Sequence, residues 1–272
     1  MMSVLLRAPP SAWFGIIVTA TYLFVAIFAP WLAPYLETEI VGAEFEPRGG
    51  EFILGTDKLG RDMLTRMLFG ARNTVGLAFI ITSFAFLIGV TLGLLAAAKG
   101  GWLDQLLGRF VDVVISVPSL ILALLLLTIT GTGTVPLAMV IAAIQSPPVF
   151  RIARAAAMDV AVMDYVEAAR LRGESLFWIM RREILPNAAP PLIAEFGLRF
   201  VFVFLFISAL SFLGLGLQPP AADWGGMVRE NAILINYRDI TPLLPAGAIA
   251  LLAIAVNFIV DWVLHLASGL KQ

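Results

Sequence analysis

Residues 151–191 read RIARAAAMDVAVMDYVEAARLRGESLFWIMRREILPNAAPP and form a charged island in an otherwise apolar chain. Eleven of the chain's 37 charged residues (18 basic and 19 acidic) fall within these 41 positions. Long apolar runs flank the island on both sides. An apolar run of about 20 residues is what a helix needs to cross a bilayer. The island is therefore predicted to be a loop between two membrane spans.

The composition of the whole chain agrees with a membrane protein. Of its 272 residues, 60% are hydrophobic and only 14% are charged, and the mean hydropathy is +0.93. Soluble domains are about 45–50% apolar and about 25% charged. We therefore expect an all-α polytopic membrane protein. The net charge of −1 gives no reason to expect a nucleic-acid partner.

Several kinds of catalytic or cofactor site are excluded by residue counts. The chain has no cysteine, so it has no disulfide and no thiolate metal site, and His265 alone cannot make a two-histidine metal motif. None of the lysines, Lys58, Lys99 and Lys271, precedes Ser or Thr, so a Walker A phosphate loop is absent. We expect no catalytic residue, metal or cofactor in this chain. If ATP drives the protein, another chain binds it.

Six apolar runs are candidate spans. They are residues 13–33, 75–98, 111–129, 136–150, 192–217 and 243–266. The first run is longer than the 7–15 apolar residues of a signal peptide and has no clear cleavage site, so we interpret it as an uncleaved span. The fourth is short and is interrupted by Pro147-Pro148. In the second, Gly89 and Gly93 have the small-xxx-small spacing that favours close helix packing.

Lysines and arginines predict the orientation of these spans. Six spans place both termini on one side. With the termini inside, eleven basic residues, Arg7 and Lys271 among them, lie on the inner side and seven on the outer side. The bias predicts that residues 151–191 lie inside and that residues 34–74 and 218–242 lie outside.

The charged island is predicted to hold two short helices. In residues 158–172, an apolar face is formed by Met158, Val162, Val166 and Ala169. The opposite face carries Asp164, Glu167 and Arg170, of which the last two have i, i+3 spacing. Gly173 stands where a left-handed glycine ends a helix.

The second helix is predicted to start at Ser175, whose side chain can cap it. Its apolar edge is Leu176, Phe177, Ile179 and Met180. Pro186 has no N–H to donate, so the helix is expected to end near Leu185. An alternative interpretation of the island is an amphipathic hairpin that lies on the membrane surface.

The island also resembles a known motif. Glu167-Ala168-Ala169, followed by Gly173 and ending in Leu185-Pro186, is similar to the EAA loop of ABC importer permeases. That resemblance implies a coupling helix that docks in a groove of an ATPase. The ATPase-coupling residues that it implies are Asp164, Glu167, Ala168, Ala169, Arg170, Gly173, Leu185 and Pro186. One departure is Glu183, where the family often has Ile and its peptide-type branch commonly has a polar residue.

Three more segments resemble the dipeptide/oligopeptide/nickel branch of these permeases, in particular the subunit with the shorter first outer loop. They are residues 54–72, residues 211–225, and the pair Asn257 and Asp261. Two departures are Val260, where glycine is usual, and a charged tail reduced to Lys271-Gln272. The motifs follow the family's order over most of the chain.

From the residues alone, the segment from Asp57 to Arg72 is predicted to be an amphipathic helix. Asp57 and Arg61 have i, i+4 spacing, as do Asp62 and Arg66. On the outer side these four charges could face a binding protein. The alternative is an interfacial helix that only anchors the second span.

Polar groups inside spans are candidates for a translocation path. Glu195 and Arg199 have i, i+4 spacing and are expected to neutralise each other. The remaining path candidates are Thr128, Gln145, Ser208, Ser211, Asn257 and Asp261. A hydroxyl bonded to its own helix backbone is the alternative for Ser and Thr.

The resemblance implies a type I ABC importer permease fold in a bacterial inner membrane. The six runs and the charge bias predict that both termini are cytoplasmic. The resemblance also implies a second permease as heterodimer partner, ATPase subunits that bind ATP and Mg, a periplasmic solute-binding protein, and the lipid bilayer. The alternatives are a secondary carrier or channel, which would need charged relays in mid-membrane, and an intramembrane enzyme, for which no Ser/His pair is evident. The substrate is not readable.

Overall fold

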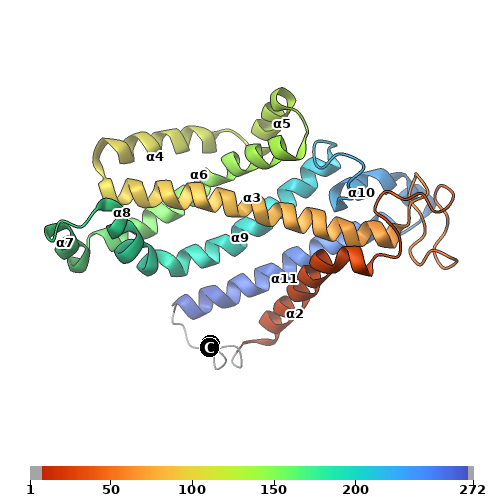
Figure 1. Cartoon of the computed structure of the whole chain (residues 1–272), viewed down its shortest axis with the longest axis horizontal. Helices are drawn as coiled ribbons and strands as arrows, with labels where there is room; N and C mark the ends of the chain where they lie inside the picture. Colours follow the sequence, from red (N-terminus) through yellow and green to blue (C-terminus); the bar gives the residue numbers. More distant parts are fainter. Residues whose placement is uncertain (1–7, 269–272) are drawn as a thin grey trace.

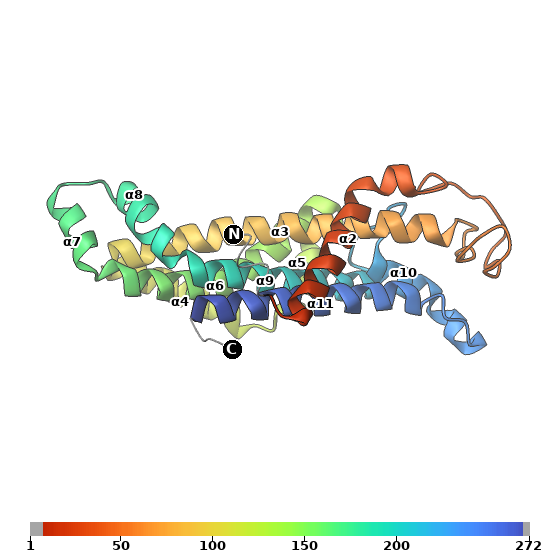
Figure 2. The same cartoon turned by 90° about the horizontal axis from the view of Figure 1, so that it is seen from below.

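The computed structural model describes residues 8–268, so Arg7, Lys271 and Gln272 lie outside the described residues. Every long element in this range is a helix, which confirms the all-α fold (Figure 1). The elements are α2 (Pro10–Leu32), α3 (Met63–Lys99), α4 (Gly101–Ser116), α5 (Ser119–Thr130), α6 (Thr134–Ala161), α7 (Asp164–Leu171), α8 (Leu176–Ile179), the π-helix η1 (Met180–Ile184), α9 (Leu185–Phe212), α10 (Trp224–Asn231), the 3₁₀-helix η2 (Ala232–Tyr237) and α11 (Leu243–Ser268). We call the two ends of the elongated bundle the α7 end and the α10 end (Figure 2).

Five helical segments in the described range are long and apolar enough to cross a membrane. They are Pro10–Leu32, Met63–Lys99, Thr134–Ala161, Leu176–Phe212 and Leu243–Leu266. A sixth span results only if the bent pair α4 and α5 is taken together. The predicted runs 75–98 and 136–150 are therefore parts of the longer helices α3 and α6. Both helices continue into charged segments that the apolar runs leave out.

The predicted third span, residues 111–129, is not one straight helix. Helices α4 and α5 meet at 91° across Val117-Pro118. Proline disfavours the helical conformation of the residue before it, and Val117 is accordingly extended with ψ 129°. A continuous run of apolar residues does not reveal such a bend, since the spacing of apolar residues is the same on both sides of it.

The prolines expected to interrupt the fourth span do not break the helix. Helix α6 continues through Pro147-Pro148 to Ala161. Pro147 cannot donate to the carbonyl of Ala143 four residues earlier. The Ser146 hydroxyl donates to that carbonyl instead, at 3.1 Å. A side-chain donor thus satisfies the backbone group that proline leaves free, which is how membrane helices tolerate proline.

Close packing of α3 on α6 organises the bundle, as the spacing of Gly89 and Gly93 predicts. A Cβ added at Gly89 would lie 2.7 Å from the Ser146 carbonyl oxygen. One added at Gly93 would lie 2.8 Å from the Ala153 Cβ. The two backbones approach so closely that only glycine fits. Helix α4 then folds back beside α3 and α6 (Figure 1).

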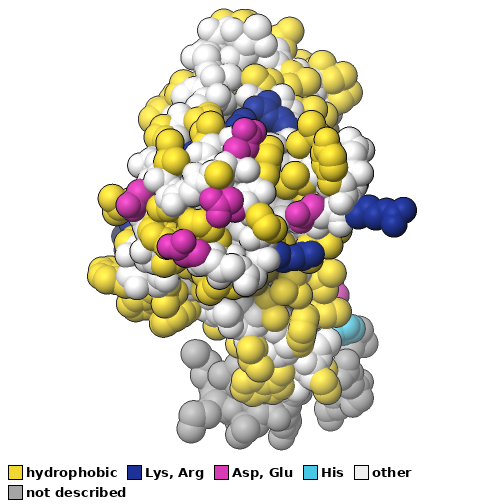
Figure 3. Space-filling view, turned by 90° about the vertical axis from the view of Figure 1, so that its right-hand side faces the viewer, with side chains coloured by type: hydrophobic (Ala, Val, Ile, Leu, Met, Phe, Trp, Pro, Cys, Tyr) yellow, Lys and Arg dark blue, Asp and Glu magenta, His cyan; other side chains and the backbone are white. Residues whose placement is uncertain are grey.

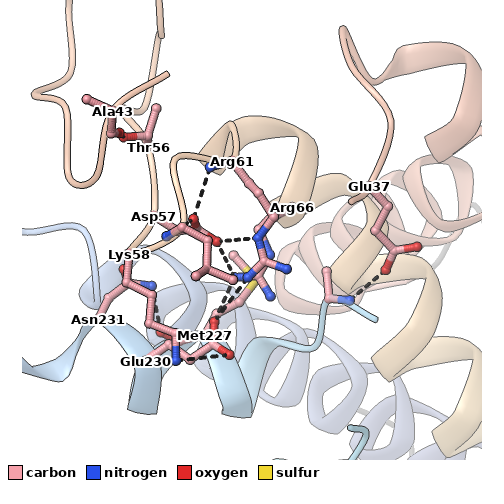
Figure 4. Close-up of polar contacts among 12 residues, drawn as sticks. Glu37, Ala43, Thr56, Asp57, Lys58, Arg61, Arg66, Met227, Glu230 and Asn231 are labelled. Carbon is pink, nitrogen blue, oxygen red and sulfur yellow. Dashed lines mark hydrogen bonds and ion pairs between the residues drawn. The ribbon is translucent and has the colours of Figure 1, made fainter. Parts of the chain in front are cut away.

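A buried ion network fastens the α10 end (Figure 4). Arg66 Nη1 lies 2.7 Å from Asp57 Oδ2 and 2.7 Å from Glu230 Oε2. Arg61 Nε lies 2.8 Å from Asp57 Oδ2, and Arg61 Nη2 lies 3.7 Å from Glu230 Oε2. The four side chains are at most 8% exposed. Two arginines and two carboxylates therefore balance each other out of water, and join the loop after α2 to α3 and α10.

The hydrogen bonds around Asp57 show why it stays charged. Burial by itself raises the pKa of the Asp57 carboxyl. The backbone N–H groups of Arg61 and Leu59 and the charges of Arg66 and Arg61 lower it, and they leave the pKa below its usual value. Nearby, Asp223 caps α10 by accepting from the N–H groups of Gly225 and Gly226, while its burial raises its pKa to about 6.

This network corrects the prediction of an amphipathic helix from Asp57. Residues 53–62 are turns, and α3 begins only at Met63. Asp57 and Arg61 do pair, but across a turn. Asp62 does not pair with Arg66 but caps α3 by accepting from the N–H of Thr65 at 2.7 Å. Glycine at position 60, with φ +74°, lets the chain turn where a helix would not.

The charged face expected to contact a binding protein is also absent from the surface. Asp57, Arg61, Asp62 and Arg66 are all buried, so they cannot form an exposed surface in this conformation. At the surface of this end, other acidic and basic side chains lie among hydrophobic ones (Figure 3).

We expect Glu230→Gln to loosen the loop after α2. The change leaves Arg61 and Arg66 with only Asp57 as a buried counter-charge, and breaking a buried pair costs about 3–5 kcal/mol. Hydrogen exchange should therefore speed up at the amides of residues 55–63, measured by mass spectrometry on the purified protein. The matched control is Glu44→Gln, an exposed acid of the same loop. Equal protection in both variants would contradict the fastening role.

Candidate functional site

Helices α7 and α8, in the middle of the charged island, form a projection at the α7 end (Figure 2). The sequence predicts one helix over residues 158–172, but the structure has two. Helix α6 ends at Ala161, Met163 is extended with ψ 144°, and α7 starts at Asp164. The break separates the residues of the predicted apolar face: Val166 is fully buried, whereas Val162 is 80% exposed. A continuous helix could not have packed Val166 and Ala169 against the bundle.

Glycine at position 173 ends α7 as predicted. Its φ of +79° is left-handed. The N–H of Glu174 donates to the Ala169 carbonyl at 3.2 Å, and that of Gly173 donates to the Arg170 carbonyl at 2.9 Å. These two bonds are the Schellman pattern. A Cβ at Gly173 would meet nothing within 4 Å, so the backbone angle alone requires glycine. Ser175 caps α8, also as predicted, by accepting from the N–H of Trp178.

The expected helix end at Leu185-Pro186 is wrong. The chain passes from α8 through the π-helix η1 into α9 without a break, and the N–H of Leu185 donates to the Met180 carbonyl five residues earlier. Pro186 has no N–H to donate, and the π-helix that ends just before it shifts the register of the backbone hydrogen bonds. The wider π-helical turn of η1 therefore lets the helix continue through the proline.

The inner face of α7 packs on the ends of two long helices. Val166 and Ala169 share a core with Leu94 and Ala98 of α3 and with residues of α6, α8, η1 and α9. Arg170 Nη2 donates to the Ala98 carbonyl at 3.1 Å. That carbonyl belongs to the last turn of α3, which carries the partial negative charge of the helix. No ion pair of Arg170 with Glu167 forms among residues 8–268; the arginine points to α3 instead.

The outer face of the projection is apolar and charged at once. Val162 and Leu171 are more than three-quarters exposed, at 80% and 84%, and Phe177 is also exposed. Asp164, Glu167 and Ala168 lie on the same exposed side of α7. A surface of this kind, on a helix whose other face is locked into the bundle, can receive a partner and pass a displacement to the long helices.

The intramembrane charges neutralise each other as predicted. Arg199 Nη2 lies 2.5 Å from Glu195 Oε1. Arg199 Nη1 also donates to Gln145 Oε1 of α6 at 3.1 Å, and the guanidinium lies 5.5 Å from the Phe202 ring centre. The structure therefore brings Gln145 together with this pair. Because the Glu195–Arg199 pair has no net charge, its contact with Gln145 ties α6 to α9 at little electrostatic cost.

Of the other candidates for the path, Ser208 and Ser211 lie one turn apart on α9, and both lie against Gly225 of α10. Thr128 and Ser208 donate to the carbonyls of Leu124 and Phe204, the residues four positions earlier. Ser211 is buried near the end of α9, Asn257 is half-buried on α11, and Asp261 is exposed. A role in a translocation path remains a prediction for these residues. Among residues 8–268 no group of His, Asp and Glu is arranged to hold a metal ion.

Sequence reasoning missed three acidic residues that hold distant segments together. Glu230 completes the ion network. Asp104 of α4 pairs with Arg154 of α6, with Nη2 to Oδ2 at 2.6 Å. Glu37 accepts from the Asn73 side chain at 2.8 Å and the Ala222 N–H at 2.6 Å. Each partner is at least 36 positions away, so no local spacing pattern points to these contacts.

Comparison with known families matches two parts of the chain. Residues 89–268 match the family described as binding-protein-dependent transport system inner membrane component. Residues 5–44 match the N-terminal TM domain of oligopeptide transport permease C.

Curated relatives extend the similarity to nearly the whole chain. The di/tripeptide transport system permease protein DppC of Pseudomonas aeruginosa is 36% identical and covers 91% of this chain and 84% of its own length. The dipeptide transport system permease protein DppC of Alkalihalophilus pseudofirmus is 34% identical over 91% of this chain and 82% of its own. The peptide transport system permease protein SapC of Escherichia coli is 35% identical, over 93% and 88%.

Solved structures share the fold. An inward-facing structure of the MetNI methionine ABC transporter matches 77% of this chain and 98% of its own chain, with a TM-score of 0.62 and 18% identity. A second match is an amino acid ABC transporter crystallised with histidines, with a TM-score of 0.55, 20% identity, and coverage of 73% and 92%. These confirm the type I ABC importer permease fold. The chain belongs to the binding-protein-dependent transport system inner membrane component family, and it is a multi-pass inner-membrane permease of an ABC importer.

Proposed function

We propose that this permease carries short peptides and is driven by separate ATPase subunits that dock on the projection at the α7 end. The substrate class is supported by the relatives, which are named for di/tripeptide, dipeptide and peptide transport. The docking assignment is supported by one observation above all: α7 has a buried inner face, a glycine-capped end and an exposed outer face. ATP and Mg belong to the ATPases in this proposal.

The predicted coupling residues divide by face. Asp164, Glu167 and Ala168 are the outward residues that would meet the ATPase. Ala169 and Arg170 hold α7 to the end of α3, the latter through the Ala98 carbonyl. Gly173 sets the turn into α8, and Leu185-Pro186 join η1 to α9. A push on α7 would therefore displace the ends of α3, α6 and α9 together, as a rigid-body motion requires.

A second, unlike permease and a periplasmic solute-binding protein complete the proposed importer. The family description and the resemblance to the shorter-loop subunit support both partners. The solute-binding protein would approach the α10 end, since that end is opposite the ATPases. The network around Asp57 would keep the loop there in one shape rather than contact the binding protein directly.

We expect the termini and the α7 end to be cytoplasmic. A periplasm-active reporter fused after Lys271 should be inactive, because the predicted orientation leaves it inside. The same reporter inserted at Gly49, an exposed turn with open space around it, should be active. Alkaline phosphatase activity in whole cells measures both. The opposite pattern would overturn the orientation.

We expect Gly173→Val to weaken ATPase docking while the protein still inserts into the membrane. Its left-handed φ costs a non-glycine residue roughly 1–2 kcal/mol, and more for a β-branched one. The matched control is Gly173→Asn, because asparagine tolerates this conformation. Copurified ATPase per permease should fall about tenfold for Val and stay near wild type for Asn, with equal permease levels. If Val copurifies like wild type, or Asn fails like Val, the docking assignment is wrong.

A further inference from the structure

A polar pocket of about 540 Å³ opens between α4 and α6, toward the α7 end of the bundle. Its charged lining residues are Asp104, Arg109, Asp112, Arg151 and Arg154. All five lie on α4 or α6, and none lies on α7 or α8. Three arginines against two aspartates leave the pocket with one net positive charge.

The charges in this pocket are not equally engaged. Asp104 and Arg154 satisfy each other through a two-pronged pair, with both carboxylate oxygens bonded. The negative charge of Asp112 also attracts the Arg154 guanidinium. Arg109 and Arg151 are exposed, and neither has a hydrogen bond or ion pair within residues 8–268. Two guanidinium groups on two helices are therefore free to bind an anion, each with five N–H donors.

An apolar surface lies directly beside these arginines. Trp102, Leu106, Phe110 and Val113 are exposed on α4 at i, i+4, i+8 and i+11. Arg109 lies at the border between this face and the pocket, since it is three residues after Leu106 and four before Val113 on α4 and lines the pocket as well. In a membrane protein an exposed apolar face of this kind can pack against acyl chains, and Trp102 at the helix start suits the headgroup region.

We propose that the pocket binds the phosphodiester headgroup of an anionic phospholipid, with Arg109 and Arg151 holding the phosphate oxygens. The acyl chains would run along the Phe110 and Val113 side of α4. Guanidinium groups bind phosphate in a two-pronged manner, and basic pockets between membrane helices favour anionic headgroups. A soluble anion would match the arginines but would leave the adjoining apolar face unused. This site depends on membrane insertion and not on ATPase docking.

The test compares lipids retained by the purified protein. Wild type is extracted gently from vesicles of equal phosphatidylglycerol and phosphatidylethanolamine, and its bound lipids are counted by native mass spectrometry. We expect enrichment of phosphatidylglycerol in wild type. The double variant Arg109→Gln with Arg151→Gln should lose roughly tenfold in apparent affinity, since each basic residue near a membrane contributes substantially to binding anionic lipid. The control double variant Arg48→Gln with Arg238→Gln, at the α10 end, should keep the enrichment.

A charge-conserving variant separates recognition from misfolding. Arg109→Lys with Arg151→Lys keeps both charges but loses the planar fork, so it should bind phosphatidylglycerol at an intermediate level. No enrichment in wild type, or equal enrichment in the Gln and wild-type proteins, would overturn the proposal. So would full displacement of the lipid by inorganic phosphate or by a dipeptide, because the site would then recognise a soluble anion.

Discussion

The close approach of α3 and α6 at Gly89 and Gly93 is the constraint on which the rest of the structure depends. It places the last turn of α3 beside the last turn of α6, so the chain that leaves α6 can fold α7 back onto Ala98. It also leaves room for α4 to return along both helices and for the Asp104–Arg154 pair to form. A side chain at either glycine would separate the two backbones, and the docking projection would lose the surface on which its inner face packs.

A second constraint comes from the bilayer, where a backbone group without a partner is costly. Five of the prolines that look like helix breakers lie inside continuous helices: Pro147, Pro148, Pro186, Pro190 and Pro191. At Pro147 the Ser146 hydroxyl supplies the missing donor, and before Pro186 a π-turn shifts the register. At Pro118 the same residue type does bend the chain, between α4 and α5. In the proposed coupling, this continuity would let a displacement of η1 pass directly into α9.

Local signals in the sequence predicted the features that depend on a few neighbouring residues. The left-handed Gly173, the Ser175 cap and the Glu195–Arg199 pair are of this kind, and so are the glycines between α3 and α6. The break at residues 162–163 could not be predicted, because it is decided by which face of α7 the bundle can bury. Glu230 could not be found either, since its partners Arg61 and Arg66 are more than 160 residues away in sequence. The exposed charges expected at Asp57 and Arg61 became a buried network for the same reason.

In the proposed mechanism, α7 and the end of α3 move as one body when the ATPases close. Because the chain has no cysteine, a pair introduced at the exposed positions Lys99 and Leu171 can be joined selectively. A reducible reagent long enough to bridge them without strain is applied to the assembled importer, and ATP-driven peptide uptake is measured before joining, after joining and after reduction. A rigid unit predicts the same uptake rate in all three states. Uptake that stops on joining and returns on reduction would contradict the account.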